Sequence, residues 1–174
     1  MTDYLLSISL GPVQEFIAAA RKTRDLWYGS DLLSQVSRCA AREVRDTGAA
    51  LVFPAPQALD ADHDDVPIAN KIVAIVPRDL DPSDVATRAR AAAQAYLSRE
   101  RDDALARARG AGLRHPVAEA MLDQQLSAFL ETYCAWQPCE PAQPGAYAAA
   151  RDRVEALLAG RKAMRDFRPA VGRD

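Results

Sequence analysis

The sequence contains few cysteines and no long apolar run. Its three cysteines, Cys39, Cys134 and Cys139, form no C-x-x-C pair and are too scattered for the disulfide framework of a small secreted domain. No stretch approaches the roughly 20 consecutive apolar residues that cross a bilayer, and the N-terminus lacks the basic and apolar regions of a signal peptide. We therefore expect reduced thiols, no contact with a membrane and a cytoplasmic location.

An excess of charge of either sign is also missing. The net charge is -2 over 174 residues, whereas proteins that bind nucleic acid through bulk charge usually have a basic surface. Any contact with RNA would therefore have to be local. The chain also has no low-complexity tail and no internal repeat.

Histidine is scarce as well. His63 stands beside Asp64 in an acidic stretch, as in some metal-dependent phosphohydrolases, but the only other histidine is His115. Such a metal site needs several further ligands. A serine or cysteine nucleophile would lack a convincing base for the same reason. We expect neither a metal centre nor nucleophilic catalysis.

Hydrophobic patterning predicts one α+β domain over residues 1–174. The chain is 49% hydrophobic, which is enough to close one core at this length. Its expected order is β-α-α-β-β-α-α-β-α, a ferredoxin-like β-α-β-β-α-β pattern in which each helical position is expanded. We predict an acidic loop at 59–66 and a proline-rich linker at 139–146. The expected strands are 5–10, 51–53, 71–76 and 129–136, the last ending at Pro138, and the last helix is 147–167.

Helix boundaries follow from residues that start or stop helices. Pro12 suits the first turn of a helix, and Ser30 can cap a second helix that Gly48 ends, with a bend at 27–29 between the two. Asp81 is a further capping residue, followed by proline at the first helical position. That helix should fade near Gly110, and another should start at Pro116. The predicted buried stripes are Leu33, Val36, Ala40 and Val44; Val85, Ala89, Ala92 and Tyr96; Val117, Met121 and Leu122; and Val154, Leu157 and Leu158.

The turn at Ser9 to Gln14 is the first candidate binding site. A helix that opens directly after a strand presents free backbone N–H groups and partial positive charge, which stabilise a phosphate. Gly11 permits a close approach of the backbone, and Gln14 offers a donor and an acceptor. The turn is neither a P-loop nor a G-x-G-x-x-G motif. An ordinary tight β-α turn is the alternative interpretation.

A cationic and aromatic cluster follows as the second candidate. Arg21, Lys22 and Arg24 stand beside Trp27 and Tyr28, so that guanidinium groups could contact phosphate oxygens and an aromatic ring could stack on a base. Trp27 with Ser30 would shape the wall of the site. The alternative is a solvated helix face with Trp27 in the core, because such charge spacing is common on helices.

The run GPVQEFIAAARKTRDLWYGSDLLS resembles the opening of the polymerase-like region of the large subunit of type III-B (Cmr) CRISPR effector complexes. The similarity extends over nearly the whole chain, and it includes a short strand at Leu51 to Pro54 and a closing segment at Arg161 to Phe167. Ala69 and Lys71 replace the Pro and Arg of the family pattern, and Cys134 stands where a Trp is usual. The matching segments of the opening run are Gly11 to Gln14, Phe16 and Ile17, Ala20 to Trp27, and Gly29 to Ser34.

The resemblance implies a first palm domain that holds nucleotides together with a second palm. In the family, the second palm carries a Gly-Gly-Asp-Asp motif that binds metal ions and converts ATP to cyclic oligoadenylate when target RNA is bound. This sequence has no Gly-Gly-Asp-Asp and, by the same resemblance, lacks the HD nuclease domain and the zinc module. We therefore expect no catalysis by this chain alone, and ATP with Mg²⁺ shared with a second palm.

Three functions stay open at this point. The chain could bind an ATP-like nucleotide or pair with a catalytic palm half, or it could be a structural subunit that docks other effector proteins or guide RNA. A stand-alone RNA-binding ferredoxin-like module is the third. Expected partners are the other type III-B subunits, a palm half with Gly-Gly-Asp-Asp and, indirectly, guide and target RNA; a homodimer is also compatible.

Overall fold

The computed structural model describes residues 2–12, 18, 20–60, 66–113 and 116–164. These residues contain a four-stranded sheet in the order β2-β3-β1-β4, with every neighbouring pair antiparallel. β1 and β3 are central, whereas β2 and β4 lie at the edges. The strands are β1 (Asp3–Gly11), β2 (Ala50–Phe53), β3 (Lys71–Val76) and β4 (Glu131–Cys139).

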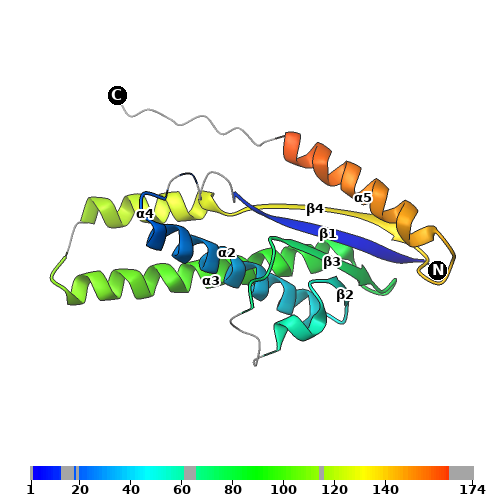
Figure 1. Cartoon of the computed structure of the whole chain (residues 1–174), viewed down its shortest axis with the longest axis horizontal. Helices are drawn as coiled ribbons and strands as arrows, with labels where there is room; N and C mark the ends of the chain where they lie inside the picture. Colours follow the sequence, from blue (N-terminus) through cyan, green and yellow to red (C-terminus); the bar gives the residue numbers. More distant parts are fainter. Residues whose placement is uncertain (1, 13–17, 19, 61–65, 114–115, 165–174) are drawn as a thin grey trace.

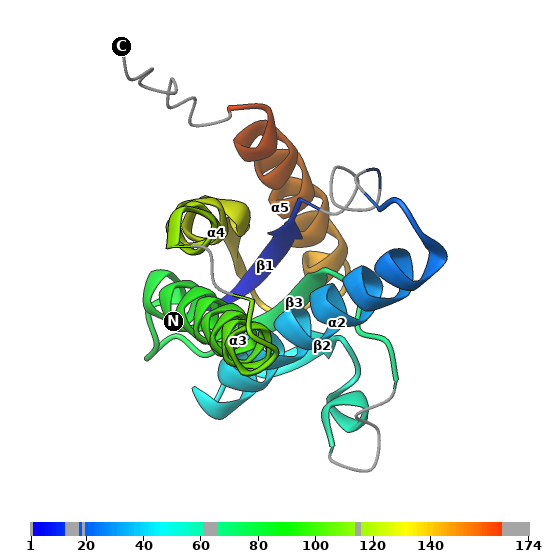
Figure 2. The same ribbon diagram turned by 90° about the vertical axis from the view of Figure 1, so that its left-hand side faces the viewer.

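Helices cover both faces of this sheet (Figures 1 and 2). α2 and α3 pack side by side on one face, and α5 packs on the other against β4 and β1. α4 and the C-terminal part of α3 extend past the end of the sheet (Figure 1). This arrangement confirms the predicted α+β class and is compatible with a ferredoxin-like palm. The helices are α2 (Thr23–Asp46), α3 (Pro82–Gly110), α4 (Pro116–Phe129) and α5 (Ala146–Ala163), with a 3₁₀ turn, η1 (Pro56–Leu59).

Alternation along β1 divides the interior into two cores, because successive side chains of a strand point to opposite faces. The larger core includes Leu6, Ile8 and Leu10 and lies under α2 and α3. The smaller core joins Leu5 to α5. Each face of the sheet therefore has its own apolar layer, and the odd-numbered side chains of β1 share the α5 side.

Three polar side chains on α2 hold the segment that joins β2 to β3. They are spaced four residues apart, so they lie on one side of the helix. Arg38 is fully buried there. The bonds run from Arg38 to the carbonyl oxygens of Ala58 and Val66 (2.6 and 2.5 Å), from Arg42 to that of Leu59 (3.0 and 2.8 Å), and from the Ile68 N–H to Ser34 Oγ (2.7 Å). The part of α2 from Ser34 to Arg42 is thus fixed to this segment.

The bend predicted at 27–29 is wrong, since α2 runs unbroken from Thr23 to Asp46. Ser30 lies inside the helix and is not its cap; Lys22 occupies that position without a side-chain bond. A glycine inside a helix costs only about 1 kcal/mol, and packing of α2 along α3 outweighs that cost at Gly29. The helix predicted after Pro12 falls mostly on residues outside the described ranges.

The predicted end of the last strand is also wrong. β4 continues through Pro138 to Cys139. A proline is tolerated there because β4 is an edge strand, and its missing N–H removes no hydrogen bond from the interior of the sheet. The predicted linker at 139–146 is correspondingly shorter, since Ala146 already begins α5.

Capping residues and glycines in the sequence predicted several helix ends correctly. The Asp81 carboxylate accepts a bond from the Ser83 N–H at 2.8 Å, and α3 ends at Gly110 as predicted. Gly48 follows the end of α2 with a φ of 94°, which favours glycine. The stripe of α2 predicted at Leu33, Val36, Ala40 and Val44 is buried.

The buried face of the later helices differs in part from the prediction. Ala92 and Tyr96 are only partly buried, because the face of α3 that packs into the core is the one that carries Ala93 and Leu97. Leu157 is 45% exposed beside the buried Val154 and Leu158. Met121 of α4 is 54% exposed and Leu122 is partly buried, because this part of α4 lies beyond the sheet.

Candidate functional site

The first predicted group of site residues lies at the end of β1. Ser9 is 4% exposed, between Lys71 of β3 and Tyr133 of β4 in the register. Its side chain belongs to the α5 side of the sheet. Gly11 ends the strand opposite Glu131, and Gln14 lies outside the described residues. The proposed phosphate turn therefore stays a prediction, with its β1 portion buried in the sheet.

The second predicted group forms an exposed surface at the start of α2. Arg21, Arg24, Trp27 and Ser30 are all exposed. The Arg24 side chain is 78% exposed, and its Nε lies 3.6 Å from a carboxylate oxygen of Asp25. Trp27 is 74% exposed. The alternative that placed Trp27 in the core is therefore wrong.

The Ser9 side chain does not face the second group. Ser9 shares the α5 side, whereas α2 packs on the opposite face. The structure brings Arg21, Arg24 and Trp27 onto one surface segment, and the joining of Ser9 to that segment stays a prediction. We call the exposed segment the α2-start surface; it comprises Arg21, Lys22, Arg24, Leu26, Trp27 and Tyr28.

Two tyrosines and a glutamate join the α2-start surface to α3. The Tyr28 hydroxyl donates to a carboxylate oxygen of Glu100 at 3.5 Å. Burial, followed by the Glu100 charge, raises the pKa of both Tyr28 and Tyr96. The Arg99 guanidinium lies 5.8 Å from the centre of the Tyr96 ring. Both phenols therefore stay protonated at neutral pH and anchor one side of the surface.

Sequence reasoning missed this α3 contribution. Tyr96 and Glu100 are four residues apart, which places them on one helix face, but nothing local indicated that this face meets Tyr28. The pairing depends on how α2 crosses α3, and that is set by the core below them.

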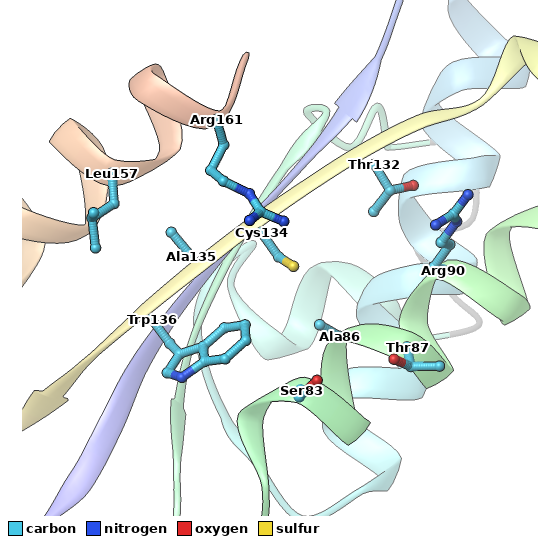
Figure 3. Close-up of a pocket in the computed structure, with 10 residues that line it drawn as sticks. All are labelled: Ser83, Ala86, Thr87, Arg90, Thr132, Cys134, Ala135, Trp136, Leu157 and Arg161. Carbon is cyan, nitrogen blue, oxygen red and sulfur yellow. The ribbon is translucent and has the colours of Figure 1, made fainter. Parts of the chain in front are cut away.

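A cavity of about 390 Å³ at the edge of the sheet was also missed (Figure 3). It lies where α3, β4 and α5 meet, and its walls include two arginines, a tryptophan and a cysteine. Burial raises the pKa of the Cys134 thiol, whereas the charges of Arg161 and Arg90 lower it. The lining residues are Ser83, Ala86, Thr87, Arg90, Thr132, Cys134, Ala135, Trp136, Leu157 and Arg161.

The described part of the chain contains no preformed metal site. Within the described ranges, no group of three or more His, Cys, Asp or Glu side chains is arranged to hold a metal ion. No helix among the same residues is long and apolar enough to cross a membrane.

Comparison with known proteins identifies the family. Residues 5–101 match the model of the family described as CRISPR-associated protein Cmr2, N-terminal. The chain belongs to this family. The match covers more than half of the chain and includes most of β1, the α2-start surface and most of α3. No curated protein matches the chain.

Membership of the Cmr2 N-terminal family confirms the resemblance drawn from the opening run. The chain corresponds to the N-terminal portion of a type III-B large subunit, which is one subunit of a multisubunit Cmr complex. A role in type III-B CRISPR defence follows from this membership. The molecular task of the chain within the complex is a separate question.

Proposed function

We propose that this chain is a palm-like unit that binds an ATP-like nucleotide and pairs with a second palm half, without catalysing a reaction alone. The observation that carries the proposal is the α2-start surface, where Trp27 is 74% exposed among cationic side chains. Large apolar side chains gathered on a surface usually mark a binding region.

The apolar part of this surface favours a protein partner. Leu26, Trp27 and Tyr28 are consecutive and are 40%, 74% and 52% exposed. Tryptophan and tyrosine are enriched among residues that dominate binding energy at protein interfaces. The Tyr28 hydroxyl also donates a long hydrogen bond of 3.5 Å to Glu100, so the surface is in contact with α3. This favours contact with a second palm half.

The cationic part fits a nucleotide. Arg21 and Arg24 can donate to phosphate oxygens, and the face of Trp27 can stack on a base. Asp25 already lies 3.6 Å from the Arg24 Nε, but both side chains are exposed, so a phosphate could replace this weak contact. The residues present therefore fit the base and the phosphates.

The same residues do not fit the metal. Mg²⁺ requires oxygen ligands, and the described residues contain no acidic cluster that could hold it. Bound with ATP, Mg²⁺ would neutralise phosphate charge. Its carboxylate ligands would come from the second half, since this sequence lacks Gly-Gly-Asp-Asp.

ATP binding can be tested by tryptophan fluorescence in a variant that keeps only one of the two tryptophans. Trp27 and Trp136 are the only two in the chain, so Trp136→Phe leaves Trp27 as the sole indole fluorophore. ATP with Mg²⁺ should change its emission in a saturable way. Replacing Arg21 and Arg24 together by Gln should weaken binding about ten-fold, as expected for the loss of charge-assisted bonds. The control is Arg151→Gln with Arg153→Gln, two exposed residues of α5.

Pairing is tested separately by co-purification with a palm half that carries Gly-Gly-Asp-Asp. Trp27→Ala should lower the amount retained, whereas Leu113→Ala, which removes a 69% exposed side chain at the end of α3, should not. Retention that is unaffected by Trp27→Ala would rule out this surface as the contact.

A structural subunit that docks protein or guide RNA is the second candidate. The three exposed apolar side chains favour it, because they suit a partner without any nucleotide. In that case the partner should bind equally well with and without ATP, and Trp27 emission should not respond to ATP alone. A stand-alone RNA-binding module would bind RNA without the other effector subunits.

A further inference from the structure

The described walls of the cavity at the sheet edge carry positive charge and no counter-charge. Arg90 approaches from α3 and Arg161 from α5, so the two guanidinium groups reach it from opposite faces of the sheet (Figure 3). Both are close enough to lower the pKa of the Cys134 thiol, which lies between them on β4. Among the described residues, no acidic side chain lines the cavity.

Neither arginine is neutralised elsewhere in the described part of the chain. Arg90 and Arg161 have no ion pair or hydrogen bond among the described residues. Arg88, two residues before Arg90, shows the usual arrangement, since its guanidinium lies 2.6 Å from a carboxylate oxygen of Glu43. Like charges that share a cavity repel each other. A bound anion would remove this repulsion.

Hydroxyl groups at the cavity can also donate hydrogen bonds to a bound ligand. The Thr132 Oγ1 is buried and has no hydrogen-bond partner among the described residues. An unsatisfied buried polar atom costs about 1–3 kcal/mol, so such atoms in native proteins usually have a partner. The hydroxyls of Ser83 and Thr87 line the same cavity from α3. Together with the guanidinium groups, they form a donor set suited to phosphate oxygens.

Trp136 gives the cavity a flat apolar wall beside these donors. Its indole packs partly against the larger core, so its position is fixed. The cavity volume, about 390 Å³, lies within the range of small-molecule sites, roughly 300–1,000 Å³. An inorganic anion would leave most of this space and the indole face unused.

We propose that this cavity binds a mononucleotide, with its phosphate between Arg90 and Arg161 and its base against Trp136. The site is distinct from the α2-start surface, because it uses other residues and lies at the β4 edge of the sheet. A guanidinium group that donates to phosphate oxygens and a base that stacks on an aromatic ring are favourable contacts.

The first test uses Trp27→Phe, which leaves Trp136 as the only tryptophan. AMP should change its emission in a saturable way, and inorganic phosphate should bind at least about ten-fold more weakly because it lacks the stacked base. Arg90→Gln and Arg161→Gln should each weaken AMP binding about ten-fold. Arg153→Gln, exposed on the same helix as Arg161, is the matched control and should not.

The second test measures alkylation of Cys134 by iodoacetamide, read by mass spectrometry. AMP should slow the reaction at Cys134 because it covers the thiol and neutralises the two charges that favour the thiolate. The reaction at Cys39, on α2, should not change. This test does not depend on tryptophan emission, and melting curves establish that each variant is folded.

Three results would overturn this proposal. One is the absence of any response to AMP at millimolar concentration in both tests. Another is AMP binding that both Gln variants leave unchanged. The third is protection of Cys134 by a 5′-phosphorylated RNA but not by AMP, which would assign the cavity to RNA. Because the α2-start surface is tested through Trp27 with Trp136 removed, the two proposals can fail independently.

Discussion

The C-terminal half of α2 buries Arg38 completely and bonds it to two carbonyl oxygens, whereas the N-terminal half leaves Arg24 and Trp27 largely exposed. Both halves belong to one unbroken helix. The same residue type therefore serves the fold at one end and remains available to a partner at the other. Arginine and aromatic content alone does not distinguish these uses; burial and hydrogen bonding do.

Removing the buried guanidinium should have the largest effect on stability. Arg38→Ala leaves the carbonyl oxygens of Ala58 and Val66, whose bonds to Arg38 are part-buried, without this donor. A buried polar group that loses its partner costs about 1–3 kcal/mol. We expect the free energy of unfolding to fall by about 2–4 kcal/mol, with an added cost from the lost volume. Urea denaturation measures it. Arg24→Ala, on the same helix, is the control and should change stability by less than about 0.5 kcal/mol.

Ser34, at the middle of α2, tests the contact with the same β2–β3 segment with a smaller group. Ser34→Ala removes the acceptor of the Ile68 N–H, a buried bond of 2.7 Å. The expected loss is about 1–2 kcal/mol in the free energy of unfolding. Hydrogen exchange at the Ile68 amide should speed up together with it. An unchanged exchange rate at this amide would show that the bond does not hold the β2–β3 segment.

High pH should weaken the contact between the exposed half of α2 and α3. The fold raises the pKa of the Tyr96 phenol above its ordinary 10.0, mainly by burial and then by Glu100. The unfolded chain therefore loses this proton first, so the stabilisation is complete below pH 10.0 and declines as the pH rises above it. Tyr96→Phe should reduce the slope of unfolding free energy against pH in that range. Equal slopes for the two proteins would contradict the assignment.

Trp27 should show almost no effect on stability. Trp27→Ala removes a side chain that is 74% exposed, so the unfolding free energy should change by less than about 0.5 kcal/mol. A loss above about 2 kcal/mol would mean that the indole packs against the protein as a core residue does. In that case the contrast between the two halves of α2 would disappear.

Much of the fold could be predicted because it depends on local signals. The capped start of α3 at Asp81, the apolar run of β3 and the positive-φ glycine at Gly48 each have a local physical cause. The cluster at Arg24 and Trp27 was a candidate site for the same reason, but its exposure was not predicted, because the alternative with Trp27 in the core stayed open.

The missed features depend on contacts between distant segments. The continuity of α2 through Gly29 follows from packing on α3, and the tolerance for Pro138 follows from the edge position of β4. The sheet-edge cavity brings Arg90 and Arg161 together from helices that are far apart in the sequence. The spacing of residues within one segment could not predict these contacts between distant segments.

A nucleotide site on the α2-start surface is tested by the affinity of ATP with Mg²⁺ for the Trp136→Phe protein, read from Trp27 emission. We expect a saturable change, with an affinity that weakens about ten-fold when Arg21 and Arg24 are both replaced by Gln, while the Arg151→Gln and Arg153→Gln control keeps the original affinity. A flat response at millimolar ATP, or equal affinity in the two double variants, would contradict it.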